Sequence, residues 1–299
     1  MIRLVLLFLF FSTAYATCSQ DGDTVTIDHV GDINFDPREN QGSSSMYYCQ
    51  NYVKADVKHL IILSATSISR TNFFDINNNP ALETIVANSI TSITNNNVFK
   101  NSNLISVEMN NLETVSGTNV LAFTTALTSV SFPALKSVGN AFLMDAATIT
   151  TIDLPALTTV GDSFLRSTTA LTSVSFPALT SVGGWFLINS GITTISLPAL
   201  TTVGDDFLTG NTITSLYFPV LTTIGDNFML AGASSPPSDY TYTSFKWNAY
   251  CKDWYEALEV AASDQIKGTM AAAVAGMPIG TTCPEGRTDR CIKNEYVNV

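Results

Sequence analysis

The sequence predicts a β-rich solenoid of about eight coils, closed by a disulfide-stapled N-terminal cap and a helical C-terminal cap. Two observations predict the solenoid: one phrase recurs every 21–23 residues, and apolar and polar residues alternate within each copy. Such a period indicates units that stack as successive coils, because one unit cannot bury its apolar side alone. A third observation, cysteines confined to the two ends of the chain, predicts the caps.

The repeated phrase is clearest in "LTSVSFPALKSVG" from Leu127 to Gly139 and "LTSVSFPALTSVG" from Leu171 to Gly183. Three residue columns keep spacings of 22, 22, 21 and 21 across five copies. They are the prolines Pro133, Pro155, Pro177, Pro198 and Pro219, the glycines Gly139, Gly161, Gly183, Gly204 and Gly225, and the phenylalanines Phe142, Phe164, Phe186, Phe207 and Phe228. Upstream, the phase continues in Leu60, Leu82 and Leu104. The solenoid is therefore expected over residues 60–230.

Each copy of the phrase predicts one short strand. Val174 and Phe176 alternate with Ser173 and Ser175, which is the period of a half-buried strand. Pro177 ends the strand because it has no N–H to donate to a neighbour. Every coil is thus expected to bury one side of its strand and to expose the other.

The second half of each copy predicts an inward residue, a turn and a core aromatic. Val182 is expected to point inward, and Gly183 to form a tight turn with a positive φ, which costs little at glycine. Phe186 is expected to fill the space between coils. The phrase therefore encodes one complete turn of the solenoid.

The first sixteen residues have the pattern of a secretory signal peptide. Arg3 precedes an apolar run from Leu4 to Phe11, and Ala14-Tyr15-Ala16 has the small-x-small form of a cleavage site. The run is too short for a membrane-spanning helix, and no later stretch reaches eighteen apolar residues. The mature chain is expected to be secreted or held at the cell surface, without a transmembrane segment.

The five cysteines flank the predicted solenoid and none lies within it. In an exported chain, Cys18 and Cys49 predict a disulfide that staples an N-terminal cap over residues 17–59. Among the three cysteines of the C-terminal cap, residues 231–299, we favour a bond between Cys251 and Cys283 over one between Cys283 and Cys291. One cysteine is then left over, free or paired with another chain.

The C-terminal cap follows the Pro/Ser-rich boundary "SSPPSDY" at Ser234–Tyr240. Downstream, Trp254, Leu258 and Ala261 have helical spacing, which predicts a compact helical cap over the last coil. The polar positions of this segment include Asp and Glu, which disfavours a helix lying on a membrane.

The composition excludes several classes of partner. The formal net charge is −11, and only 13% of residues are charged, below the roughly 25% of ordinary domains. No basic cluster is present to meet nucleic-acid phosphates or anionic lipid. Serine and threonine, rather than charges, are expected to hydrate the solenoid.

The segments "ALTSVSFPALTSVGGWFL" and "GITTISLPALTTVGDDFL" resemble the BspA-like class of leucine-rich repeats. The resemblance covers residues 127–230 well and 60–121 loosely. Pro177-Ala178 stands where leucine-rich repeats usually have asparagine, and no cysteine follows the phenylalanine. Fungal cell-wall and receptor-L-type repeats are similar too. The resemblance implies a leucine-rich-repeat-like solenoid of a surface or secreted protein used for adhesion or recognition, without catalysis.

The exposed strand positions predict a candidate binding face of two aligned columns. The first column is Ser129, Thr151, Ser173, Thr194 and Ser215, and the second is Ser131, Asp153, Ser175, Ser196 and Tyr217. Tyr217 is the only aromatic residue among them, so we expect weak contacts repeated along the face. An extracellular protein or glycan is the expected ligand, or another copy of the chain. Trp185 is expected on a different edge.

No residue pattern predicts catalysis or a cofactor. The two histidines, His29 and His59, lie near no known catalytic motif, so no catalytic residue is assigned and the chain is not expected to be an enzyme. A recurring acidic position could hold calcium, but turn capping is the favoured interpretation and no metal site is assigned. That position is occupied by Asn140, Asp162, Gly184, Asp205 and Asp226.

The sequence supports three functions, in order of preference. The first is a non-enzymatic recognition or adhesion protein that binds through the repeat surface. The second is a structural component of an extracellular matrix or wall that self-associates, with the odd cysteine as one means of linking chains. The third is ice binding by the hydroxyl columns, which Asp153 and Tyr217 interrupt.

Overall fold

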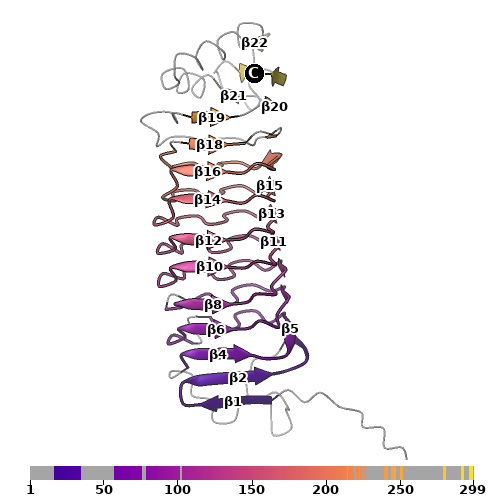
Figure 1. Cartoon of the computed structure of the whole chain (residues 1–299), viewed down its shortest axis with the longest axis vertical. Helices are drawn as coiled ribbons and strands as arrows, with labels where there is room; N and C mark the ends of the chain where they lie inside the picture. The colour runs from indigo at the N-terminus through magenta and orange to yellow at the C-terminus, as the bar shows by residue number, and fades with distance from the viewer. Residues whose placement is uncertain are drawn as a thin grey trace, which may run out of the picture.

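The computed structural model describes residues 17–34, 57–75, 79–101 and 103–213, followed by short stretches between residues 215 and 298. These residues form a β-solenoid in which the coils stack along one axis, with the first strands at one end and the last at the other (Figure 1). They contain strands and turns but no helix. The predicted signal peptide, residues 1–16, and the predicted helix around Trp254 lie outside the described residues.

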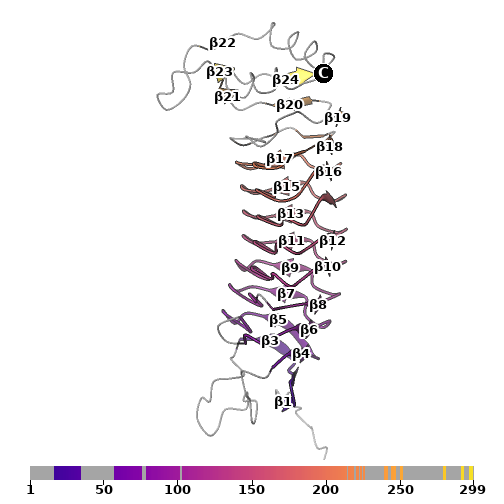
Figure 2. The ribbon, with the colours of Figure 1, turned by 90° about the vertical axis from the view of Figure 1, so that its left-hand side faces the viewer.

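Two columns of strands run along the solenoid, one on each side (Figure 2). We call them the front column and the back column. The front column contains β2 (Thr24–Asp28), β4 (His59–Ile62), β6 (Thr84–Val86), β8 (Ser106–Glu108), β10 (Ser129–Ser131), β12 (Thr151–Asp153), β14 (Ser173–Ser175), β16 (Thr194–Ser196), β18 (Ser215–Tyr217) and β19 (Asp239–Thr241). The back column contains β3 (Gly31–Ile33), β5 (Ala65–Ile68), β7 (Ser92–Ile93), β9 (Thr114–Val115), β11 (Ser137–Val138), β13 (Thr159–Val160), β15 (Ser181–Val182) and β17 (Thr202–Val203).

The two ends of the chain pair differently from the stack. At the N-terminal end, β1 (Thr17–Asp21) pairs antiparallel with β2, whereas β2 pairs parallel with β4. The antiparallel strand covers the open edge of the stack, which would otherwise offer unpaired backbone groups. At the other end lie β20 (Ser244–Lys246), β21 (Tyr250–Cys251), β22 (Ile279–Gly280), β23 (Cys291–Ile292) and β24 (Tyr296–Asn298).

The back column is continuous and the front column is not. All eight back strands belong to one parallel sheet from β3 to β17. The front strands fall into three groups, because β8 does not pair with β10 and β12 does not pair with β14. Val107 in β8 and Ile152 in β12 are only partly buried, unlike the central residues of β10 and β14. Each interruption therefore opens the core slightly on the front side.

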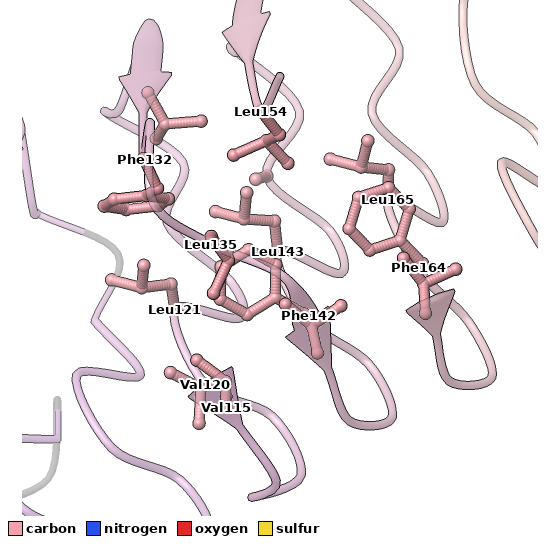
Figure 3. Packing of buried hydrophobic residues seen from close by; sticks show 14 of the residues in the cluster. Val115, Val120, Leu121, Phe132, Leu135, Phe142, Leu143, Leu154, Phe164 and Leu165 are labelled. Atoms are coloured by element: carbon pink, nitrogen blue, oxygen red, sulfur yellow. The ribbon is translucent and has the colours of Figure 1, made fainter. Parts of the chain in front are cut away.

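The core is filled by an aromatic stack, as the phenylalanine column predicts (Figure 3). Phe142, Phe164, Phe186 and Phe207 are fully buried, and successive rings lie 6.2, 5.7 and 5.2 Å apart with nearly parallel planes. A second column alternates large and smaller residues from coil to coil and meets the stack edge-on; it consists of Phe132, Leu154, Phe176, Leu197 and Phe218. Burial of each such side chain contributes about 1.5–3 kcal/mol.

The glycine column has a different role from the predicted one. The prediction of a positive φ at Gly183 is wrong, because among the described glycines only Gly22, Gly31 and Gly210 have a positive φ. A Cβ on Gly183 would instead lie 2.7 Å from the backbone carbon of Gly161, in the preceding coil. Glycine is required here because the coils approach so closely at the end of the back strands.

Positive φ occurs at other residues of the turns, in three alternating positions. The first left-handed position, with φ between 56° and 59°, holds Asn72, Asn97, Asn119, Ala141, Ser163, Trp185 and Asp206. Left-handed residues in turn donate their N–H groups to the next coil and to the preceding coil. Ser163 donates to the Gly184 carbonyl of the next coil (2.8 Å), and Leu165 to the Phe142 carbonyl of the preceding coil (3.2 Å). A left-handed residue other than glycine costs about 1–2 kcal/mol, which these hydrogen bonds between coils offset.

Candidate functional site

The predicted face lies on the front column in the predicted register. Ser129 pairs with Thr151, and Ser131 with Asp153. The remaining six residues align across three strands: Ser173, Thr194 and Ser215 in one line, and Ser175, Ser196 and Tyr217 in the other. Because β12 and β14 belong to different sheets, the ten residues form two ladders rather than one.

Most of the side chains of this face point to solvent. The residues of β10, β12 and β14 that belong to the face are exposed, as is Thr194, while Ser196 is half-buried. Tyr217 is 41% exposed. The Ser131 hydroxyl donates to the Asp153 carboxylate, Oγ to Oδ2 3.1 Å, across two strands. The face therefore offers hydroxyl groups, one carboxylate and one phenol ring to a ligand.

The same columns continue upstream into coils that the sequence prediction left out. His59, Thr84 and Ser106 stand in register on the first column, and Val86 and Glu108 on the second. The His59 Nδ1 lies 2.7 Å from the Thr84 hydroxyl. These positions have the same offset from Leu82 and Leu104 as Ser129 has from Leu127, so the leucine spacing contained the signal.

One ion pair lies at the start of this extension. The Lys58 ammonium is 2.8 Å from the Glu83 carboxylate, one coil away. The hydrogen bond from Lys58 to Glu83 and the charge of Glu83 raise the pKa of Lys58 above its ordinary value. Both side chains are solvent-accessible, so the pair adds local charge order and little stability.

Hydroxyls beside the back column are used within the protein. Thr158 Oγ1 donates to the Lys136 carbonyl (2.8 Å), Thr180 Oγ1 to the Thr158 carbonyl (3.0 Å), and Thr201 Oγ1 to the Thr180 carbonyl (3.0 Å). Each bond ties one coil to the preceding one. Thr150 and Thr193, which precede the front strands β12 and β16, make the same bond to the Thr128 and Thr172 carbonyls (both 3.2 Å). Threonines that precede a strand thus stabilise the stack, unlike the exposed hydroxyls within the front strands.

The recurring acidic position caps backbone groups of the next coil. Asn140 Oδ1 accepts from the Asp162 N–H (2.9 Å), and Asp162 Oδ1 accepts from the Gly184 N–H (2.8 Å). Within the residues that the structure describes, no three His, Cys, Asp or Glu side chains gather where they could hold a metal ion. Asp226 lies outside the described residues.

The predicted disulfides stay predictions. Cys18 lies in β1 and packs against the core, while Cys49 lies outside the described residues. At the other end, Cys251 and Cys291 stand opposite each other in the paired strands β21 and β23, and Cys283 lies outside the described residues.

The histidines occupy separate places near the N-terminal end. His29 Nε2 lies 3.0 Å from the Asp32 carbonyl oxygen, so this ring nitrogen has a backbone partner. His59 Nε2 is 3.8 Å from an Asp23 carboxylate oxygen, longer than a hydrogen bond. The His59 ring thus contacts the Thr84 hydroxyl through Nδ1, but the Asp23 carboxylate is too far from Nε2 to orient the ring by a hydrogen bond.

Comparison with known sequences identifies the repeat. A family model described as "BspA type Leucine rich repeat region" matches residues 42–168 and 136–232, in six copies. Six is fewer than the eight coils expected from the leucine and proline spacing. No curated protein sequence matches the chain.

Solved structures of bacterial leucine-rich repeat proteins are similar over much of the chain but distant. A leucine-rich repeat protein from Bacteroides ovatus shares 14% identity, with 73% of this chain and 79% of that chain covered and a TM-score of 0.37. A leucine rich cell surface protein from Faecalibacterium prausnitzii shares 14% identity, with 70% and 76% covered and a TM-score of 0.29. Among the described residues, no helix has the length and apolarity needed to cross a membrane.

Proposed function

This chain belongs to the BspA-type leucine-rich repeat family, and on that premise we propose that it is a non-enzymatic recognition or adhesion protein. It is secreted or held at the cell surface, and its front column binds an extracellular protein or glycan. The observation that supports this proposal most is the set of exposed hydroxyls standing in register on the front strands. The threonines that precede the back strands, Thr158, Thr180 and Thr201, instead donate their hydroxyls to carbonyls of the preceding coil.

The chemistry of the face favours a ligand that touches many coils. Each exposed serine or threonine can donate one hydrogen bond and accept others, and such bonds to neutral groups are individually weak. Repetition at a coil spacing of roughly 4.8 Å lets an extended ligand engage several coils at once. Affinity is then expected to rise steeply with the length or valency of the ligand.

The proposal includes the ends of the chain. A signal peptide over residues 1–16 directs export, and the Cys18–Cys49 and Cys251–Cys283 bonds hold an N-terminal cap and a helical C-terminal cap on the solenoid. Capped ends protect the terminal coils from pairing with other chains. The spacing of the cysteines at both ends of the repeat supports this arrangement.

The test is saturable binding of residues 17–299 to a panel of extracellular proteins, glycans and intact cells. A front variant, Ser173→Lys with Ser175→Lys, places two long cations on exposed positions of β14. A back variant, Thr114→Lys with Thr159→Lys, adds the same charge to exposed positions of β9 and β13. The proposal expects the front variant to lose binding and the back variant to keep it. Equal binding by both variants would refute the assignment of the face.

A second function is supported by the odd number of cysteines, five in the chain. One thiol left over from two bonds could join two chains into a structural assembly. Disulfide-linked dimers on non-reducing gels, together with no saturable binding to the panel, would favour that function. We do not propose ice binding, since Asp153 and Tyr217 interrupt the exposed columns and the back threonines donate to carbonyls.

A further inference from the structure

Trp185 differs in size from the residues at the equivalent position of the other coils. The first left-handed position holds small residues or the asparagine and aspartate that tolerate this conformation, except at Trp185, where φ is 56°. A bulky residue is unfavourable there, and burial does not offset the strain, because Trp185 is 46% exposed. The fold does not explain the tryptophan.

The residue before Trp185 departs from the repeat as well. Gly184 stands where neighbouring coils have Asn140, Asp162 and Asp205. A Cβ on Gly184 would meet no atom closer than the Asp205 carbonyl oxygen at 3.4 Å, so close packing does not demand glycine. The coil with the exposed Trp185 indole therefore has no side chain at the preceding residue, Gly184.

Acidic residues lie in the coils on both sides of Trp185. The Trp185 N–H donates to the Asp205 carbonyl (2.8 Å), which places Asp206 at the equivalent position of the next coil, roughly 4.8 Å along the stack. In the preceding coil, Asp162 has one carboxylate oxygen on the Gly184 N–H. Arg166 is the one basic residue in these three coils. The surroundings of the indole are therefore net negative.

In another turn of the same solenoid, an exposed aromatic ring packs against a cation. Phe123 is also left-handed, with φ 61°, and is 37% exposed. The Lys100 ammonium lies over its ring, 4.6 Å from the centroid. Within the described part of the chain, no cation is placed over the ring of Trp185 in this way. Tryptophan is the side chain that attracts cations most strongly through its ring face.

We propose that Trp185 and Asp206 form a subsite for a cationic side chain, lysine or arginine, of a protein partner. The cation packs on the indole and its charge is balanced by the carboxylate one coil away. This inference deepens the proposed recognition function and rests on it. It adds a site on the turn edge, next to the back column rather than on the front face, so a protein ligand is held at two separate surfaces.

The test uses residues 17–299 and a fluorescently labelled nona-arginine peptide, with the neutral nona-citrulline peptide beside it. Trp185→Asn places at this position the residue that the first coils carry there, so folding is retained. We expect about tenfold weaker binding of nona-arginine by Trp185→Asn and about threefold weaker binding by Asp206→Asn. Leu63→Ala removes an exposed apolar side chain outside the front face, and Asp21→Asn removes a distant exposed charge in β1; both are expected to change the affinity less than about twofold.

Four results would overturn the inference: no saturable binding of nona-arginine, equal binding of nona-citrulline, unchanged binding by Trp185→Asn, or equal losses in Asp206→Asn and Asp21→Asn. A loss of neutral glycan binding in Trp185→Asn, with peptide binding intact, would also overturn it in favour of a sugar platform. The two proposals fail separately. If the front lysine variant loses cell binding while Trp185→Asn keeps both peptide and cell binding, only the subsite is wrong. If no variant or parent binds the panel, the recognition function itself is wrong.

Discussion

Within a single coil, the front strand β14 and the back strand β15 are built from nearly the same residues, yet they have different environments. β15 pairs with β13 on one side and β17 on the other, within an unbroken sheet. β14 pairs with β16 but not with β12. At the end of the back strand, Gly183 also allows the backbones of adjacent coils to approach closely.

The comparison indicates that the back of the solenoid holds the coils together, whereas the front presents exposed side chains. On the back, glycines and threonine hydroxyls bind each coil to the next, so substitutions there disturb the stack. On the front, interruptions of the ladder and exposed side chains leave room for variation. We therefore expect substitutions of these glycines and of the threonines that precede the back strands to change stability, and substitutions of exposed front residues to change binding.

Removing a core side chain that lies between the two columns should have the largest effect on stability. Phe186 is fully buried between Phe164 and Phe207, and Phe186→Ala should lower the free energy of unfolding by about 3–5 kcal/mol. Denaturant unfolding of residues 17–299 measures the loss. Tyr217→Ala, which removes a side chain that is 41% exposed, serves as the control with an expected change below about 0.5 kcal/mol. Similar losses in both variants would contradict the observed core.

Gly183→Ala should lower the free energy of unfolding less than Phe186→Ala does, but far more than Gly184→Ala does. Gly183→Ala places a Cβ against the backbone of Gly161 and should destabilise by about 1–3 kcal/mol. Gly184→Ala meets only ordinary contacts and should be nearly neutral. The thermal unfolding midpoints of the two variants give the comparison. A neutral Gly183→Ala would show that close stacking does not explain the glycine column.

A hydroxyl that bonds to the preceding coil should contribute to stability, whereas one exposed on a front strand should not. Thr180→Val removes the hydrogen bond from Oγ1 to the Thr158 carbonyl and should destabilise by about 1 kcal/mol, with rescue in Thr180→Ser. Thr151→Val removes an exposed hydroxyl of β12, and its expected effect is below about 0.5 kcal/mol. Unfolding measured in parallel compares the pair, and equal effects would remove the distinction between the columns.

The smallest expected effect has the opposite sign. Ser163 has φ 59°, where glycine has no Cβ strain, so Ser163→Gly should raise the free energy of unfolding by about 0.5 kcal/mol after the entropy cost of glycine. Ser163→Ala keeps the strain and should bring no gain. A lower stability in Ser163→Gly would show that the Ser163 side chain contributes more than its backbone strain costs.

The sequence was sufficient for the features that depend on period alone. Constant spacing placed Phe186 in the core and put Ser173, Thr194 and Ser215 in one line, because equal coils stack in register. The same reasoning applied to Leu82 and Leu104 would have extended the face to Thr84 and Ser106. Period alone did not reveal the interruption between β12 and β14, where the spacing of 22 residues is the same as between the paired strands β10 and β12.

The sequence did not distinguish the physical reasons for which a residue type recurs. Glycine suits both positive φ and close approach, and only the contact of Gly183 with Gly161 identifies the second. Thr180 and Thr151 look equivalent in the repeat, but one hydroxyl faces a carbonyl and the other faces solvent. The place of Trp185 on an edge apart from the front face was expected, whereas its left-handed backbone conformation is visible only in the structure.

Hydrogen–deuterium exchange within one coil tests the central comparison most directly. In the back segment, the Thr180 N–H donates to the Thr158 carbonyl (2.9 Å) and the Gly183 N–H to the Val160 carbonyl (3.0 Å). In β14, residues 173–175 have no strand partner in the preceding coil. With fragmentation that resolves the two segments, we predict slower exchange at Thr180–Gly183 than at Ser173–Ser175. Equal exchange, or faster exchange in the back segment, would contradict the division of the solenoid into a tightly bonded back and a more open front.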